Sequence, residues 1–470
     1  MHKLFHSGSV FLGWFRLLRV GQVLRRATDT LVGPIFVGKP QARRRGQRSL
    51  NPMKIIPLVL MLASFTGPDD ELPTSVAEGY LARNEFALEL HRALHPEGAG
   101  ANAFHSPHSV WTALAMLAEG ARGESLDSLI AALAPKLAAA DRAKLHGLAG
   151  DLGERLSKTG EGVSLSSANA LWGQVGHPFR RSAVESLASH YGAALEQLEF
   201  TRDAEGARKH INRWVADHTG GHIEDLLPEG SLGKLTRLVL TNAVHFLADW
   251  SQPFDSSNTA DRTFSLQDGV EATVAFMQAK SPRSFSAASF GADGVHRPYD
   301  ETASGGFVAI ELPYAGEQLA FLAIRPDDPA GLAILEAELD ASRLRDIIEA
   351  LEPTRLRFAC PKFELRQTYD LAGAAGRLGL ENLFSPKTAN LTEFAEGDPG
   401  DLYVTGAFHQ AFVRVDEKGT EAAAATGIAL GERSMPRPAP ELALDRPFLF
   451  LIRERTTGAI LFLGRLADPR

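Results

Sequence analysis

An arginine followed by a serine ends a run of very small side chains near the end of the sequence. Residues 417–434 read EKGTEAAAATGIALGERS. A long cationic side chain is what proteases with an acidic residue at the base of their specificity pocket recognise. The Arg433–Ser434 peptide bond is therefore a candidate cleavage site, and its chemistry is that of a substrate.

The small residues before this bond fit an extended strand better than a packed helix. Ala422 to Ala425 are flanked by glycine and threonine, and no apolar stripe repeats at helical spacing. Alternation in a strand divides the segment into two faces. One face carries Thr420, Ala422, Ala424 and Thr426, which are all small and uncharged, and the other carries Glu421, Ala423 and Ala425. A flexible alanine-rich linker is the alternative interpretation.

The segments on either side of this run have the character of buried strands. Residues 407–416 alternate in their second half, which predicts a strand. Residues 446–453 and 459–465 are mostly apolar and are separated by Thr457 and Gly458, which predicts a buried hairpin. We therefore expect an exposed loop between packed strands.

The segment 417–426, EKGTEAAAAT, resembles the hinge of an inhibitory member of the serpin family. Other matching motifs follow in family order from Asn84 to Pro469, and their order makes chance agreement improbable. They are NAFHSPHSV (102–110), SSANALW (166–172), INRWV (211–215), TGGHI (219–223), TRLVLTNAVHF (236–246), ELPY (311–314) and CPKF (360–363).

The resemblance implies an α+β serpin fold. It implies three β-sheets, about eight or nine helices and an exposed reactive-centre loop near the C-terminus. Strand-like and helix-like runs alternate without regular βαβ spacing, which independently favours the α+β class. We expect one serpin domain over residues 76–470.

The implied activity is irreversible suicide inhibition of trypsin-like serine proteases, and the protein is not expected to be an enzyme. In the serpin register the cleaved bond is Arg433–Ser434, and residues 419–433 then insert into the main sheet. Cleavage at Lys418–Gly419 would leave no segment to insert, and Arg437 precedes a proline, which trypsin-like enzymes tolerate poorly. Alternatives are a non-inhibitory serpin, acting as a carrier or chaperone, and an inhibitor of Arg-specific cysteine proteases.

The resemblance also assigns roles to residues outside the loop. The hinge residues are Glu417, Gly419, Thr420, Glu421, Ala422, Ala423, Ala424, Ala425 and Thr426. The shutter residues, which hold the main sheet closed, are Ser106, Ser109, Asn242 and His409. The breach residues, at the top of that sheet, are Trp250 and Phe254, together with an ion pair between Lys362 and Glu417.

The N-terminal part of the sequence has a different composition. Residues 1–52 are rich in arginine and nearly free of acids, and the short apolar run Ile55–Ala63 follows Met53 and Lys54. We interpret residues 1–75 as a basic extension, a signal peptide with its core at 53–66, and a linker, with Met53 as a candidate start. This predicts a secreted, extracellular or periplasmic protein; a cytoplasmic protein with a basic tail is the alternative.

Composition limits the other functional classes. The net charge of −8 argues against nucleic acid as a partner. The sequence contains no Gly-x-Ser-x-Gly elbow and no His-Glu-x-x-His motif, and its single cysteine, Cys360, is expected to be an inert buried thiol. We expect no cofactor, no metal and no membrane span, and a monomer whose partner is the target protease.

Overall fold

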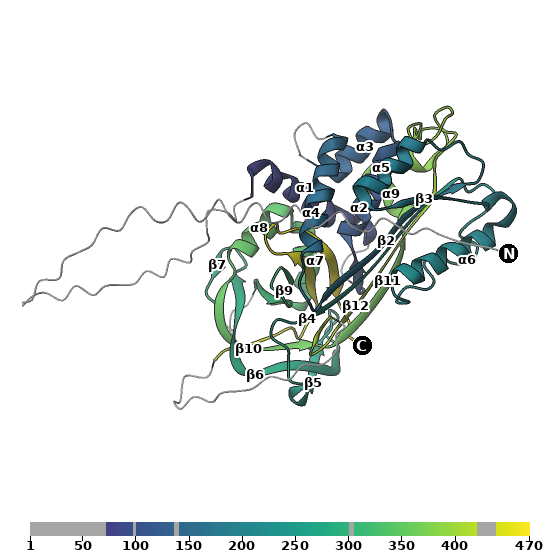
Figure 1. Ribbon diagram of the computed structural model, residues 1–470. Helices are drawn as coiled ribbons and strands as arrows, with labels where there is room; N and C mark the ends of the chain where they lie inside the picture. Colours follow the sequence, from purple (N-terminus) through teal and green to yellow (C-terminus); the bar gives the residue numbers. More distant parts are fainter. Residues whose placement is uncertain (1–71, 97–99, 136–140, 300–304, 421–438) are drawn as a thin grey trace, which may run out of the picture. The chain divides into compact units, whose positions relative to one another are not determined.

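The computed structural model describes residues 72–96, 100–135, 141–299, 305–420 and 439–470 (Figure 1). Within these ranges the chain forms nine α-helices. They are α1 (Thr74–Leu94), α2 (Pro107–Gly120), α3 (Glu124–Leu133), α4 (Arg142–Ser157), α5 (Arg181–Tyr191), α6 (Phe200–His218), α7 (Leu332–Glu338), α8 (Ala341–Glu349) and α9 (Ala372–Ala375). The first helix begins at Thr74, two residues before the expected start of the domain.

Six of the strands form one sheet whose centre has an unusual pairing. Their order is β11 (Phe363–Asp370), β12 (Val404–Val415), β13 (Gly419–Thr420), β4 (Leu238–Asp249), β2 (Val163–Gln174) and β3 (Ala194–Leu198). Strands β12 and β4 also pair directly with each other, in parallel, along most of their length. The short strand β13 separates them only at one end, where it runs antiparallel to both.

The other described strands belong to a ten-stranded sheet. Its order is β1 (Ala103–His105), β16 (Ile460–Leu466), β15 (Phe448–Glu454), β9 (Leu319–Pro326), β8 (Phe307–Pro313), β6 (Glu271–Phe290), β10 (Glu352–Pro361) and β14 (Glu441–Ala443), and β5 (Ala260–Ser265) and β7 (His296–Arg297) also pair with β6. The α+β class is confirmed. The described strands form two hydrogen-bonded sheets where three were expected, because the 20-residue β6 pairs with β5, β10 and β8 in turn.

The central strand β4 has buried residues on both faces of the six-stranded sheet. One face packs against α6 through Val239, Ala243 and the helix residue Ile211. The opposite face meets two different apolar cores along its length. At one end Leu240 packs with helices α2 to α5, and at the other Phe246 packs against the ten-stranded sheet. The junction of these two cores falls at the middle of β4 and β12.

Local sequence signals explain how the site elements begin and turn. Ser106 caps α2 by accepting a hydrogen bond from the Ser109 N–H at 3.1 Å, and Pro107 occupies the first helical turn. The predicted hairpin is formed by β15 and β16, and Gly458 has a φ of 72° in the turn between them.

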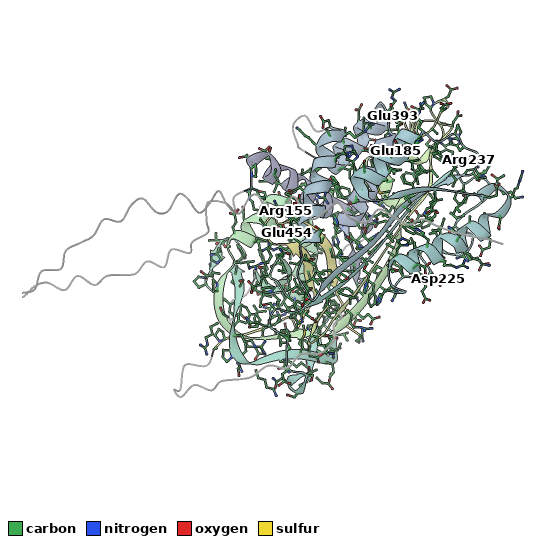
Figure 2. All side chains as sticks on the ribbon, in the orientation of Figure 1. Arg155, Glu185, Asp225, Arg237, Glu393 and Glu454 are labelled. Carbon is green, nitrogen blue, oxygen red and sulfur yellow. The ribbon has the colours of Figure 1, made fainter. Side chains whose placement is uncertain are left out.

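Charged groups lie mainly at the surface, as Glu185 on α5 and Asp225 show, both being exposed (Figure 2). Cys360 is buried in β10, and burial raises the pKa of its thiol, as expected for an unreactive cysteine. Among the described helices, none combines the length and the apolar character that crossing a bilayer requires.

Candidate functional site

Four side chains from distant parts of the sequence meet at the middle of the six-stranded sheet. Ser106 and Ser109 come from the start of α2, and Asn242 and His409 are paired across β4 and β12. All four are at most 1% exposed. These are the residues that the serpin resemblance assigns to the shutter.

The hydrogen bonds among these residues specify which ring nitrogen of His409 carries the proton. The Ser106 N–H donates to His409 Nε2 at 3.0 Å, so Nε2 must be the acceptor. His409 Nδ1 therefore donates to Asn242 Oδ1. The Asn242 amide group in turn donates to Ser109 Oγ and to Asn169 Oδ1, which extends the network to β2.

Burial lowers the pKa of His409 to about 3, so the ring is neutral at physiological pH. A second proton on Nε2 would also face the Ser106 N–H instead of accepting from it. The network sits where the two apolar cores meet, between Leu240 on one side and Val244 on the other. An interaction of this kind has two discrete states, made or broken, because a half-satisfied buried network is costly.

The hinge begins inside the sheet. Thr420 in β13 pairs with Val415 of β12 and with Ala248 of β4, and its side chain is fully buried. Its Oγ1 lies 2.8 Å from the hydroxyl oxygen of Tyr314, whose pKa is raised by burial. A side chain at Gly419 would overlap the Ala248 carbonyl oxygen, so only glycine fits this position.

The expected breach residues hold the segment that leads into β13. The Trp250 ring donates a hydrogen bond to the Asp416 carbonyl at 2.9 Å and stacks on Tyr314, with ring centroids 4.7 Å apart. The Trp250 and Phe254 backbone N–H groups donate to the carbonyls of Lys418 and Glu417, both at 2.7 Å. These contacts fix the chain just before the point of pairing.

The side chain of Glu417 is held by two neighbours. Its carboxylate lies 2.9 Å from the Lys362 ammonium group, and it accepts a hydrogen bond from the Thr259 hydroxyl at 2.5 Å. Partial burial raises the pKa of this carboxyl, but the hydrogen bonds from Lys362 and Thr259 outweigh that effect and lower it overall. The structure thus contains the ion pair that the resemblance led us to expect.

The comparison with known protein families now decides the classification. The family model described as serpin (serine protease inhibitor) matches residues 81–469. The chain belongs to the serpin family. It is 35% identical over 400 residues to the bovine leukocyte elastase inhibitor, covering 83% of this chain and 98% of that relative. It is 33% identical over 391 residues to mouse antithrombin-III, covering 83% and 81%.

The serpin fold is also found in the solved structures that resemble this one. Arabidopsis AtSerpin1, described as being in its native stressed conformation, superposes with a TM-score of 0.71 and 27% identity, over 85% of this chain and all of the other. The protein is thus a serpin in both sequence and fold.

Some predicted positions of this serpin lie outside the described residues, namely Glu421, Ala422, Ala423, Ala424, Ala425, Thr426, Arg433 and Ser434. One feature of the hinge differs from expectation. Insertion was expected to begin at Gly419, but Gly419 and Thr420 already occupy the sheet as β13. The described part of this strand ends at Thr420.

Sequence reasoning missed three contributors to this site. Tyr314 and Thr259 contact the hinge, and Asn169 extends the shutter network. The motif around Tyr314 was noticed, but a tyrosine at the end of an apolar strand does not indicate which residue its hydroxyl meets. A pattern in the sequence could have identified Asn169. It lies on the same face of β2 as the apolar residue Leu171, and that face should be buried.

Replacing Lys362 tests the support of the hinge. An ion pair that is partly exposed contributes up to about 1 kcal/mol. The Lys362→Gln variant should therefore raise hydrogen exchange of the β13 amides by roughly two- to fivefold at pH 7. Lys158→Gln removes an exposed pair on α4 and serves as the control. Unchanged β13 exchange in Lys362→Gln would mean that the pair does not restrain the hinge.

The pKa of His409 predicts how stability depends on pH. Because its folded-state pKa is about 3, the unfolded state binds up to one more proton between about pH 6.5 and pH 3. Stability should fall with decreasing pH by up to about 1.4 kcal/mol per unit from this group alone. The His409→Gln variant should show a shallower fall of its denaturation midpoint between pH 6.5 and 5. The exposed His218→Gln control should keep the original slope, and equal slopes in all three proteins would contradict the assignment.

Proposed function

We propose that this serpin irreversibly inhibits Arg-specific, trypsin-like serine proteases by presenting Arg433–Ser434 as a substrate bond. The observation that carries the proposal is the register of β13. Thr420 opposite Ala248 and Val415 defines where each later residue would lie if the strand were extended between β4 and β12.

If the strand continued in this register, Thr426 would lie at the shutter. Continuing antiparallel from Thr420, the strand would bring Thr426 opposite Asn242 on one side and His409 on the other. Those two residues are bonded to each other in the present state. Insertion must therefore break that bond, and the threonine hydroxyl brings a donor and an acceptor to replace it.

The same register explains why the inserting residues are small. Thr420 faces the core that Val244 and Phe246 also line, so Ala422 and Ala424 would enter that core by alternation. Larger side chains would clash in a packed interior. Glu421 would lie on the opposite face beside Arg414, which is exposed and cationic, so the one charged residue of the segment would avoid the core.

The segment that would insert has about the length needed to reach the far end of β4. Extension of the register brings residue 430 opposite Leu238, the first residue of β4, so residues 421–430 would fill the sheet. Arg433 would emerge beyond the far end. At ~3.3 Å per residue, the thirteen residue steps from Thr420 to Arg433 span about 43 Å. A protease attached to Arg433 would be carried about that distance.

The reaction needs only the protease's own chemistry. Its serine oxygen attacks the Arg433 carbonyl carbon, the bond to the Ser434 nitrogen breaks, and that amine leaves with the proton. The loop is then joined to the enzyme through an ester and is free to insert before water hydrolyses it. The closed sheet is therefore a metastable state held by a kinetic barrier, and opening the shutter is part of that barrier.

The choice of target depends on the loop and not on the family. Leukocyte elastase inhibitor and antithrombin-III are named for different proteases, although both resemble this chain at similar identity. Arg433 favours an acidic specificity pocket, and Glu432 should disfavour proteases with an acidic neighbouring subsite. An inhibitor of Arg-specific cysteine proteases would use the same bond.

A non-inhibitory carrier or chaperone is the second candidate. The small uncharged face of the hinge argues against it, because nothing in that face resists insertion. We also propose export through the signal peptide core at 53–66, ahead of a single domain from residue 76. Residues 1–71 lie outside the described part of the chain, so this proposal rests on composition alone.

Mixing with trypsin tests the inhibitory proposal. We expect a covalent complex that survives boiling in detergent, and mass spectrometry of the released peptide should show that it begins at Ser434. Arg433→Ala should abolish the complex with trypsin, whereas Arg437→Ala should leave it unchanged. Cleavage without a complex would contradict inhibition, and a complex with elastase but not trypsin would contradict the assigned bond.

Thr420 offers a test of insertion itself. Thr420→Arg would place a charge in a fully buried position beside Tyr314. Trypsin should then cleave the variant at Arg433 without forming the covalent complex. Thr420→Ser keeps the hydroxyl and should still inhibit. Full inhibition by Thr420→Arg would rule out insertion through this face of the sheet.

A further inference from the structure

Three histidine rings lie together beside the shutter but are not part of its hydrogen-bond network. His91 is in the last turn of α1, His95 follows that helix, and His105 ends β1. The ring centroids are 5.1 Å apart for His91 and His95, and 5.2 Å for His91 and His105. One ring nitrogen from each of the three lies within 4.8 Å of the others.

Several of these nitrogens lack a hydrogen-bond partner although they are buried. His105 is 0% exposed, and both of its ring nitrogens are without a partner; His91 is 4% exposed, and its Nδ1 is also without one. An unsatisfied buried polar atom costs stability. Phenylalanine or leucine would fill the position of His105 without that cost, so the imidazole needs another explanation.

The surroundings orient the rings as a metal site requires. The His91 Nε2–H donates to the Glu336 carboxylate at 3.1 Å, and Glu336 is held by Arg465 at 2.7 Å. Donation from Nε2 leaves the Nδ1 lone pair of His91 free to bind an ion. A carboxylate that accepts from a ligating histidine is the usual outer partner in zinc sites.

A possible fourth ligand, the hydroxyl oxygen of Tyr369, also lies close to the three rings. The Tyr369 hydroxyl lies 3.2 Å from His95 Nε2 and accepts the Phe104 N–H at 3.4 Å. We propose that His91, His95 and His105 form a binding site for a divalent transition-metal ion of the zinc class, with Tyr369 or a water as fourth ligand. Imidazole nitrogen in a tetrahedral set is the preference of Zn²⁺. We expected no metal from the sequence. His91 and His95 do have the i, i+4 spacing of many zinc ligands, but only the fold brings His105 and Tyr369 to them.

One of the three rings can be reached from outside the core. His95 is partly exposed and gives the ion a route from solvent.

Binding would join α1 to the strand that leads into the shutter. His105 precedes Ser106, whose N–H donates to His409, and the Tyr369 ring stacks on His409 with centroids 6.1 Å apart. The ion would therefore stabilise the closed sheet. This role is independent of which protease the serpin inhibits.

Zinc titration of the full-length protein, freed of metal with a chelator, tests the site. Isothermal titration calorimetry should detect one Zn²⁺ bound at this cluster, and saturating Zn²⁺ should raise the thermal midpoint by roughly 3 °C. His105→Phe should abolish that shift without lowering the metal-free midpoint, because it removes the two unsatisfied nitrogens. His95→Gln, at a partly exposed position, should weaken binding at least about tenfold.

A second cluster provides the matched control. Glu119, His146 and His190 also lie within ligating distance of one another. The double variant His146→Gln with His190→Gln should keep the calorimetric site and the thermal shift. The proposal is overturned if the wild type shows no thermal shift with Zn²⁺, if the shift survives in both His105→Phe and His95→Gln, or if only the double variant loses it.

Discussion

The hydrogen bond between His409 and Asn242 is the constraint on which the other features of this serpin depend. It joins β12 to β4, two parallel strands with no third strand between them over most of their length. The same two residues anchor Ser106 and Ser109, so helix α2 and β2 share the network. Because the cluster lies between two apolar cores, it cannot be partly open to water. The sheet is closed here in this structure, and the proposed mechanism would open it with a strand that replaces the bond.

The hinge and the shutter lie at different points along the same pair of strands, β4 and β12. Thr420 occupies the first position between the strands, and its side chain contacts Tyr314 in the core. The same register would account for the small residues at alternate positions after Thr420. It would also account for the threonine six residues after Thr420. The contacts of Trp250 and Glu417 hold the chain at the starting position. Under the proposed mechanism the two sites would be coupled, because one strand would pass through both.

Much of this could be predicted from the sequence because the motifs are local. The apolar runs around Gly458 predicted the hairpin, and the EKGTEAAAAT segment, with the motifs before it, indicated the family. Other features could not be predicted. Tyr314 meets Thr420 across 106 residues, and Asn169 meets Asn242 across 73, and no spacing rule connects such pairs. The sequence also did not predict that β6 pairs with several strands in turn and joins them into one sheet. The length of a strand does not reveal which strands it pairs with.

The sequence by itself indicated the family, gave the segment after Thr420 one small and uncharged face, and placed an arginine after it as the predicted cleavage site. Those properties belong to single residues and their neighbours in the chain. Only the tertiary structure decided that Thr420 already lies between β4 and β12, that His409 bonds to Asn242, and that three histidines lie together. Each of those facts depends on strand register and on the packing of α1 against β1, which bring together residues far apart in the chain.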